Sequence, residues 1–411
     1  MLYRIAGLAM TIGAIAGEDE ADTATGTIRQ AYLAAYWEPQ NWTEWLDIAA
    51  AIVLWPVVIV VSAVLFTGWN GARVAGATGR SHLRQFGDQL SLAVTRGILP
   101  PWYYVFELYR PGTRRRLADF LGRAETKEGV YRLLAARRGA SSPLADKFAF
   151  ARVCRAASLP TPEILAVARD GALEERPGVL PECDLFMKPV RASGGKGAER
   201  WDWTGGGRYR ISDTCLGDAS AVLDRLAARS ITRPMILQPR LTNAAELSGL
   251  SNGALATVRV LTCLDETDRP EIVGAVLRMA IGDNHTVDNL HAGGIAAGVS
   301  LSSGRLGLAT NLGMDVQLGW LARHPVSGAA IEGSMLPQWE AVQALALRAH
   351  AAFSDHLLIG WDIAPTDAGV VLIEGNHGPD LDIMQRVTLE PLGSARLGVL
   401  LAHHLARSSS V

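Results

Sequence analysis

The pattern of apolar residues divides the chain into two parts. The first third contains one long apolar run, and the remainder alternates short apolar runs with polar turns. The long run, Leu46 to Phe66, has 21 residues and a single charge at its edge. As a helix it would be about 31 Å long, which matches the hydrocarbon core of a bilayer. Trp42, Trp45 and Trp69 flank it, as aromatic residues do at membrane interfaces. We predict a transmembrane helix over residues 46–69, with a buried core helix as the alternative.

Charged residues are distributed unequally around this run. Acidic residues dominate before it, and arginines dominate after it, including Arg114 to Arg116. Because an excess of Lys and Arg marks the cytoplasmic side, we expect an inner (cytoplasmic) membrane protein whose catalytic part faces the cytoplasm. The apolar residues 1–16 fit either a signal peptide or a packed helix. Deleting about the first 70 residues should then release a soluble catalytic part.

The last two thirds of the chain predict a mixture of helices and strands. We expect one helix within Leu144–Pro162, which ends before Pro160, and another over Leu336–Ala352. Short apolar runs predict the strands Asp184–Val190, Met235–Leu241, Ala254–Leu264 and Glu271–Ile281. Gly97–Tyr109 is rich in aromatic residues, and we expect it to pack against this part. These elements predict an α+β fold.

The stretch from Leu357 to Arg386 predicts a β-hairpin with its turn near Asp367. Alternation along the strands places Asp362, Glu374 and Asn376 on one face, with Asp362 opposite Leu372 and Glu374 diagonal to it. Carboxylates that converge in an apolar sheet usually hold a cation, and oxygen ligands without Cys or His favour Mg²⁺. A surface hairpin with solvated acids is the alternative.

Cationic side chains occur on the neighbouring strands. Lys188 lies in an apolar strand, and the glycine-rich turn Arg191–Gly197 that follows can bring backbone N–H groups to phosphate oxygens. Arg259 and Arg278 each lie in an apolar strand, where a guanidinium needs an anion. That anion is either a bound phosphate or carboxylate, or a structural ion-pair partner. Asp288, Asn289 and His291 stand just before Gly293 and Gly294, where backbone can approach a ligand. A turn satisfied by its own Asx hydrogen bonds is the alternative.

Composition removes several classes of function. The net charge of −2 gives no overall basic field, which argues against nucleic-acid binding. The four cysteines never form a CxxC pair, so neither a structural zinc site nor a disulfide framework is expected.

Taken together, these motifs resemble the ATP-grasp superfamily, and within it the sugar-transfer-associated ATP-grasp family. The resemblance runs from about Leu144 to Arg386. It rests on the motifs LADKF, FMKPVRASGGKG, LQPRLTNAAELSGL, TVRVLTC, VDNLHAGGIAAG, HPVSG, IGWDIA and LIEGNHGPDLDIMQ. It implies an ATP-grasp fold, in which two α+β lobes enclose ATP. The N-terminal hydrophobic and helical region would precede these lobes.

The resemblance also implies roles for individual residues. Lys147 and Lys188 would contact the ATP phosphates, beneath a loop formed by Ser193, Gly194, Gly195, Lys196 and Gly197. The hinge beside adenine would be Gln238, Pro239, Arg240 and Leu241. Mg²⁺ would be held by Asp362, Glu374 and Asn376. Many ATP-grasp ligases carry an arginine two residues before the metal-binding aspartate. Gly360 stands there in this chain, so Arg259 or Arg278 would have to bind the phosphate instead. Arg259, Arg278 and His291 are the candidates for binding the substrate carboxylate or its acyl phosphate.

We therefore divide the chain into an N-terminal segment (1–45), a membrane helix (46–69), an arginine-rich helical connector (70–140), an ATP-grasp N-terminal part (141–235) and a C-terminal lobe (236–411). The expected activity is an ATP- and Mg²⁺-dependent ligase that joins a carboxylate to an amine or another nucleophile. Its substrate would be a cell-surface glycan or a lipid-linked precursor. A kinase acting on a hydroxyl and a nucleotide-binding membrane adaptor are the alternatives.

Overall fold

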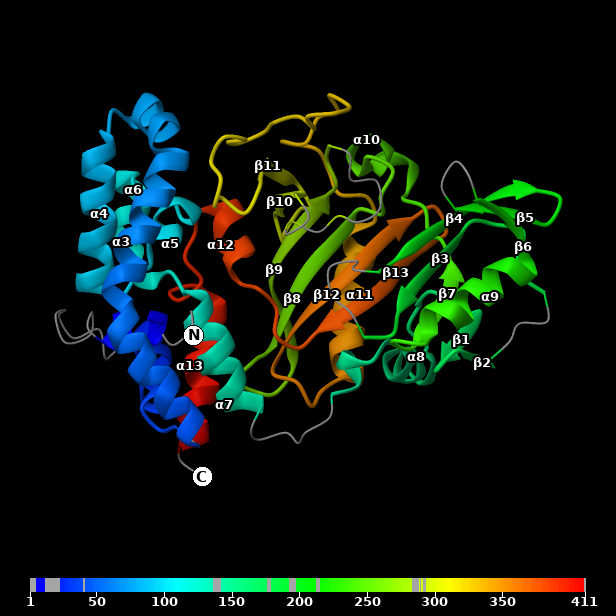
Figure 1. Ribbon diagram of the computed structural model, residues 1–411, viewed down its shortest axis with the longest axis horizontal. Coiled ribbons are helices and arrows are strands. Elements are labelled where there is room, and N and C mark those ends of the chain that lie inside the picture. Colours follow the sequence, from blue (N-terminus) through cyan, green and yellow to red (C-terminus); the bar gives the residue numbers. More distant parts are fainter. Residues whose placement is uncertain are drawn as a thin grey trace.

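The computed structural model describes residues 5–11, 23–39, 41–135, 142–175, 179–191, 197–211, 215–282, 288, 290 and 293–409. Two antiparallel sheets and their covering helices form the larger part of the molecule. A helical module built mainly from residues 5–135 lies against the C-terminal sheet (Figure 1). The α+β architecture expected from the sequence is confirmed.

The N-terminal sheet has the strand order β2-β1-β7-β3-β4-β5-β6 among the described residues. Helix α9 packs on it through Val222 and Leu226, which join buried strand residues such as Leu185 and Trp201. Helix α8 begins later than the sequence suggested, because Asp146 caps its N-terminus by accepting from the backbone N–H groups of Phe148 and Ala149. The elements are α8 (Lys147–Ala156), β1 (Ala166–Arg169), β2 (Ala172–Glu175), β3 (Leu185–Pro189), β4 (Glu199–Gly205), β5 (Arg208–Ile211), β6 (Cys215–Asp218), α9 (Ala219–Ser230) and β7 (Met235–Pro239).

The C-terminal sheet has the strand order β11-β10-β9-β8-β12-β13. Helix α11 covers one face, where Ile359, Trp361 and Ile363 of β12 join the largest apolar cluster. Helices α12 and α13 cover the other face. The elements are α10 (Ser248–Ser251), β8 (Thr257–Leu264), β9 (Pro270–Met279), β10 (Ile295–Val299), β11 (Leu306–Thr310), α11 (Trp339–Ala352), β12 (Leu358–Thr366), β13 (Gly369–Asn376), α12 (Asp382–Thr388) and α13 (Arg396–Ser409).

The helical module is fastened to this lobe by a buried ion pair. Arg386 of α12 is fully buried and lies 2.9 Å from Glu107, and Trp320 donates to the same carboxylate at 2.8 Å. The aromatic stretch around Tyr103 and Tyr104 is buried beside this pair, as we expected. The elements of the module are α2 (Ala24–Tyr36), α3 (Trp42–Thr78), α4 (His82–Arg96), α5 (Pro100–Val105), α6 (Pro111–Arg115), a π-helical turn (Glu125–Val130) and α7 (Tyr131–Ala135).

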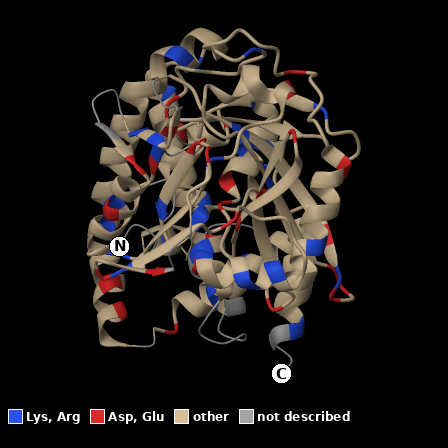
Figure 2. Cartoon of the chain, turned by 90° about the vertical axis from the view of Figure 1, so that its right-hand side faces the viewer, with Lys and Arg blue, Asp and Glu red and all other residues tan. Residues whose placement is uncertain are grey.

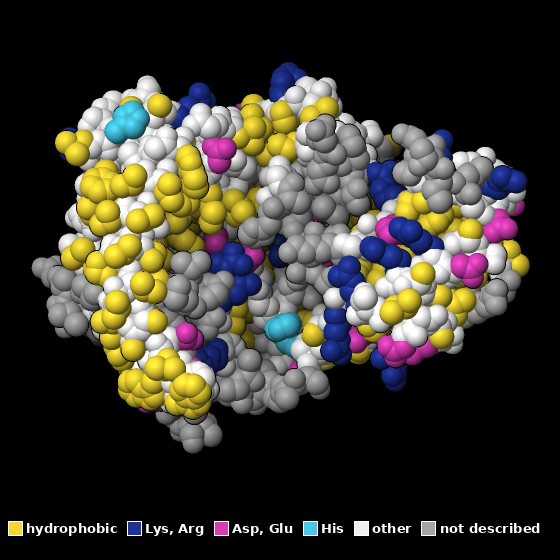
Figure 3. Space-filling model, in the orientation of Figure 1, with side chains coloured by type: hydrophobic (Ala, Val, Ile, Leu, Met, Phe, Trp, Pro, Cys, Tyr) yellow, Lys and Arg dark blue, Asp and Glu magenta, His cyan; other side chains and the backbone are white. Residues whose placement is uncertain are grey.

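Helix α3 contains the long apolar run. By length and composition it is a candidate membrane span, and 22% of its most apolar window is buried. One side, including Ile48, Ile59 and Val74, is buried in the protein. The opposite side is exposed and apolar, and Figure 3 shows hydrophobic side chains gathered over α3. We call this side the α3 apolar face; its exposed residues are Trp42, Trp45, Leu46, Ile52, Val53, Val57, Val60, Val61, Val64, Leu65 and Trp69.

The expected effect of deleting about the first 70 residues must be corrected. Helix α2 packs on α13, and Ile28 is fully buried in the same cluster as Leu397 and Leu401. Removing α2 would expose this cluster to water, at roughly 25 cal/mol per Å² of apolar surface. The N-terminal residues are therefore part of the folded lobe, and the deletion should destabilise the protein rather than release an intact soluble part.

Candidate functional site

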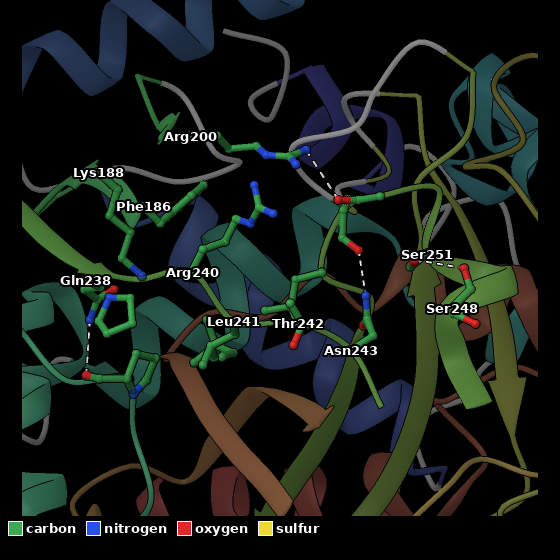
Figure 4. Close-up of a pocket in the computed structure, with 16 residues that line it drawn as sticks. Phe186, Lys188, Arg200, Gln238, Arg240, Leu241, Thr242, Asn243, Ser248 and Ser251 are labelled. Atoms are coloured by element: carbon green, nitrogen blue, oxygen red, sulfur yellow. Dashed lines mark hydrogen bonds between the residues drawn. The ribbon is translucent and has the colours of Figure 1, made fainter. Parts of the chain in front are cut away.

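A pocket of about 290 Å³ lies between the two sheets, at the lower end of the size range of ligand sites. The N-terminal sheet contributes Phe186 and Lys188 from β3, and Ile373 of β13 contributes from the other sheet. Figure 4 shows Lys188, Arg240 and Arg200 reaching toward this space. All four predicted hinge residues line the pocket: Gln238, Pro239, Arg240 and Leu241.

The hinge is held in place by its polar contacts. The amide of Gln238 is buried and donates to the carbonyl of Pro162 at 3.2 Å. Arg240 forms ion pairs with Asp184 and Asp202, and its backbone N–H donates to the carbonyl of Asp184 at 2.8 Å. These side chains fix the wall of the pocket, and the apolar faces of Phe186 and Leu241 supply surface that suits a nucleobase.

Three charged groups connect the pocket to the hairpin. Lys188 lines the pocket, and Lys147 Nζ lies 3.8 Å from Glu374 Oε2 on β13. Burial and the nearby charge of Lys147 lower the pKa of Lys188 to about 8, although Glu374 acts in the opposite direction. The structure thus places both predicted phosphate lysines beside the predicted metal ligands, and a bound polyanion would relieve the repulsion between them.

The hairpin forms as predicted, but its register differs. Asp362 pairs directly with Glu374, and Ile363 pairs with Leu372, because a bulge lies between Asp362 and Ile363. The prediction that Asp362 faces Leu372 was therefore wrong by two residues. Thr366 pairs with Gly369, which leaves a two-residue turn and shifts the register by one, and the bulge adds the second. The correction brings the two carboxylates closer together. Asn376 lies opposite Gly360 and donates to its carbonyl at 3.3 Å.

Asp362 lies between two arginines. It is 4% exposed and accepts from both Nε and Nη2 of Arg259, the latter at 3.0 Å, while Arg278 Nη2 lies 2.8 Å away. Burial alone would raise the pKa of Asp362, but the two guanidiniums lower it to about 2. Asp288 lies 3.4 Å from Arg278 on its other side, and it accepts at 2.9 Å from the backbone N–H of Thr257. Burial raises the pKa of the Asp288 carboxyl.

We call this set of charged residues the cationic row: Lys147, Lys188, Arg259, Arg278, Asp288, Asp362 and Glu374. Figure 2 shows basic and acidic segments on the central strands of the molecule. The anion that Arg259 and Arg278 contact is thus an internal carboxylate, as in the ion-pair alternative. Their action on a substrate carboxylate or an acyl phosphate stays a prediction.

Gly360 is required by its surroundings. A Cβ at this position would lie 2.8 Å from Pro379 Cβ and 3.1 Å from Arg259 Cδ. A side chain therefore has no room there, and Arg259 of the adjacent strand occupies the neighbouring space. That either arginine replaces the one that many ATP-grasp ligases carry at this point stays a prediction.

The three predicted metal ligands offer only oxygen to Mg²⁺, which is the chemistry that this ion prefers. However, both carboxylate oxygens of Asp362 already contact guanidiniums. In the described part of the chain, no three carboxylate, imidazole or thiolate groups lie close enough together to hold a metal. In the cationic row four cations face three carboxylates. The row therefore has too little negative charge to hold Mg²⁺ alone. Its residues fit Mg²⁺ that binds together with a polyphosphate, which supplies the missing negative charge.

Some predicted residues cannot be placed. Ser193, Gly194, Gly195, Lys196 and His291 lie outside the described residues. Gly197 is described and has a φ of +79°, and a Cβ there would clash with Arg233.

Sequence reasoning assigned no role to Phe186 in this site, and it placed Asp288 only in a polar cluster near a ligand, without the ion pair to Arg278. The alternation of strand β3 puts Phe186 on the same side as Lys188, which would have been the signal for it. The role of Asp288 depends on the contact of a loop with β9, and local sequence carries no signal for such a contact.

The chain is similar to one family of proteins and to several solved structures. Residues 129–394 match the family described as sugar-transfer associated ATP-grasp. Among solved structures, the chain is similar to D-alanine–D-alanine ligase from Bacillus anthracis at 11% identity, covering 65% of this chain and 68% of that one with a TM-score of 0.35. It is also similar to L-amino acid ligase from Bacillus licheniformis at 11% identity, covering 71% and 58% with a TM-score of 0.39. VanG D-Ala:D-Ser ligase from Enterococcus faecalis is similar at 13% identity, covering 64% and 61% with a TM-score of 0.35.

The match to the last two ligases spans about 60% of their own length. No curated protein matches this chain. The family match covers well over half of the 411 residues and contains both the pocket between the sheets and the β12–β13 hairpin. The protein therefore belongs to the sugar-transfer associated ATP-grasp family.

Proposed function

We propose that the protein is an ATP- and Mg²⁺-dependent ligase that activates a substrate carboxylate as an acyl phosphate, which an amine or another nucleophile then attacks. One observation carries the proposal: the pocket between the sheets opens onto the cationic row through Lys188, which belongs to both. A nucleotide whose base occupies this pocket has its phosphates directed at the row. Membership of an ATP-grasp family supports the same assignment.

The contacts of each residue in the cationic row suggest its role in the reaction. Lys147 and Lys188 neutralise phosphate oxygens at the mouth of the pocket. Glu374 and Asn376 would hold Mg²⁺ together with Asp362, and the ion would supply further neutralisation of phosphate charge. Arg259 and Arg278 lie on the far side of Asp362, where they can bind the carboxylate that receives the phosphoryl group. Transfer then depends on alignment and charge stabilisation, without a covalent enzyme intermediate.

The α3 apolar face supports one class of substrate. That surface suits contact with a membrane, so we infer that the acceptor is a cell-surface glycan or a lipid-linked precursor, modified on the cytoplasmic side. Amidation of a hexuronate is a concrete reaction of this type, because a uronate carries the carboxylate that the two arginines would bind.

The experiment that tests the ligase is an isotope transfer. A uronate labelled with ¹⁸O in its carboxylate is incubated with ATP, Mg²⁺ and a panel of amines, and the products are analysed by mass spectrometry. Activation through an acyl phosphate moves one ¹⁸O atom into inorganic phosphate when the amide forms. A phosphorylated product without free labelled phosphate would instead identify a kinase. Absence of ADP release with every carboxylate tested would overturn the proposal.

A further inference from the structure

The N-terminal end of helix α3 is attached to the lobe that carries the hairpin. Glu44, in the first turn of α3, lies 3.5 Å from Arg132 of α7. The hydroxyl of the neighbouring Tyr131 donates at 2.7 Å to the carbonyl of Pro379, in the loop that follows β13. Further along α3, Ile48 packs into a cluster with side chains of α2, and α2 in turn packs on α13. This end of α3 therefore belongs to the same folded unit as the hairpin β12–β13.

The other end of α3 is attached to the same lobe. Asn70 is fully buried, donates to the carbonyl of Met314 at 3.1 Å and accepts from the backbone N–H of Val316 at 2.9 Å. Both partners lie in the segment that follows β11 of the C-terminal sheet. Glu44 and Asn70 are about 39 Å apart along the helix, which exceeds the hydrocarbon thickness of a bilayer. One folded lobe thus reaches both ends of the apolar run.

Polar groups also lie beside α3 between its two ends. A pocket lined by Ile59 and Ser62 of α3 is lined by Arg29 and Glu125 as well, and these two form an ion pair at 2.8 Å. A helix that crossed a bilayer here would carry this ion pair into the hydrocarbon core, together with the lobe that joins its ends. Charged groups are costly at that depth, so these contacts argue against a crossing.

The outward side of α3 is apolar along its length. Residues 48–72 contain no charged side chain, and Figure 1 shows α3 running along the outer side of the helical module. Trp42 and Trp69 are exposed near the ends of the α3 apolar face, and indole rings favour the headgroup level of a membrane. Arg73 and Arg84 are exposed at the C-terminal end of α3. Their positive charge complements the phosphates of an anionic lipid surface.

The area of this face argues against a second copy of the chain as its partner. One side of α3 offers a strip about 39 Å long and about 10 Å wide, or roughly 400 Å². A stable interface between proteins buries about 800 Å² on each partner. A membrane surface has no such lower limit, because a single amphipathic helix can bind it through its apolar side.

We propose that α3 is an in-plane membrane anchor. It lies parallel to the membrane surface, with the α3 apolar face in the boundary between headgroups and acyl chains, and it does not cross the bilayer. Composition alone predicts a span over residues 46–69, and the attachment of both ends of α3 to one lobe is what changes this interpretation. Both ends of α3 and the catalytic part then lie on the same side of the membrane. The proposal does not depend on the ligase reaction.

The first test measures the depth of α3 in vesicles of phosphatidylcholine and phosphatidylglycerol. A bimane label is attached to full-length Leu46→Cys, Val57→Cys or Leu65→Cys, all changed on the α3 apolar face. Quenching is compared between lipids brominated near the headgroup and lipids brominated near the end of the acyl chain. Wild-type protein treated in parallel corrects for the native cysteines. Asp224→Cys, exposed on α9 on the opposite side of the molecule in Figure 1, is the matched control.

We expect the shallow bromines to quench all three labels to the same degree, within about twofold, because the labels lie at one depth. The deep bromines should quench each of them several-fold less, and neither lipid should quench the label on Asp224→Cys.

The second test asks on which side of the membrane each end of α3 lies. Thr43→Cys and Gly76→Cys place exposed thiols just outside the apolar run, and a Cβ at Gly76 meets no other atom within 4 Å. A membrane-impermeant maleimide is applied to right-side-out and to inside-out membrane vesicles. We expect both thiols to react in inside-out vesicles and neither to react in right-side-out vesicles.

Three outcomes would overturn the proposal. Deep quenching that is strongest at Val57→Cys would show that α3 crosses the bilayer, and so would reaction of the two end thiols from opposite sides. Absence of quenching at all three positions would remove the contact with lipid, and a disulfide between two copies of Val57→Cys would then identify a second copy on this face. Failure of the ligase proposal looks different, because ADP release would be absent while the quenching pattern stayed the same.

Discussion

The two carboxylates of the hairpin should respond differently when each loses its charge. Asp362 is 4% exposed and contacts Arg259 and Arg278, so Asp362→Asn would leave two buried guanidiniums short of negative charge. Breaking a buried pair in this way costs about 3–5 kcal/mol. Glu374 is 30% exposed and lies 3.8 Å from Lys147. A screened pair of this kind contributes about 1 kcal/mol or less, so Glu374→Gln should spare stability.

Thermal melting and ADP release, measured on the same preparations, separate the two effects. Asp362→Asn should melt about 6 °C or more below wild type, and Glu374→Gln should stay within about 3 °C of it. Both should lose at least about 10²-fold in ADP release, because each would lose a charged ligand of the metal. Glu332→Gln, an exposed change away from the row, is the control. Wild-type melting of Asp362→Asn would refute the ion-pair reasoning, and near wild-type ADP release by Glu374→Gln would refute the metal assignment.

Three further outcomes follow from the structure. Because the pKa of Lys188 is about 8, this side chain is roughly nine-tenths charged at pH 7 and one-tenth at pH 9. Affinity for ATP should therefore fall as the pH rises, and Lys188→Arg should flatten this pH profile. A flat wild-type profile would contradict the assignment of Lys188 to the phosphates. Arg278→Met should retain ATP binding by calorimetry and lose about 10²- to 10³-fold in turnover, with poor rescue by Lys; equal losses in both would place Arg278 on the nucleotide. Replacing Val53, Val57 and Val61 with Gln should move the protein from the membrane fraction to the soluble fraction without a change in melting, and unchanged sedimentation would show that the α3 apolar face does not contact lipid.

The sequence predicted the parts of the fold that depend on local pattern. The strands carrying Lys188, Arg259 and Arg278 were identified because each is a short apolar run with strong β propensity. The hairpin was identified because Pro365, Asp367 and Gly369 mark its turn. Its register was not, because alternation reveals neither the two-residue turn between Thr366 and Gly369 nor the bulge after Asp362.

Contacts between distant segments account for the remaining differences. The arginine strands suggested a missing anion, but only the pairing of β8 with β12 identifies it as Asp362. The apolar run from Leu46 to Phe66 was correctly expected to be helical, yet nothing in its composition shows that Ile48 and Ile59 are buried against the protein. Helix α2 packs on α13 of the C-terminal lobe through Ile28, a contact between distant segments for which local sequence carries no signal.

The buried pair of Arg386 and Glu107 fixes the distance between the α3 apolar face and the cationic row. Glu107 adopts a φ of +49°, a conformation that costs about 1–3 kcal/mol, and the pair holds it there. One end of this connection leads through the helical module to the α3 apolar face, and the other leads through α12 to the hairpin that ends at Asn376. If α3 lies against lipid, the cationic row is held at a fixed distance from the membrane surface. Acceptors would then be chosen by reach as well as by shape: a carboxylate too close to its anchor, or too far along its glycan, would not meet the row.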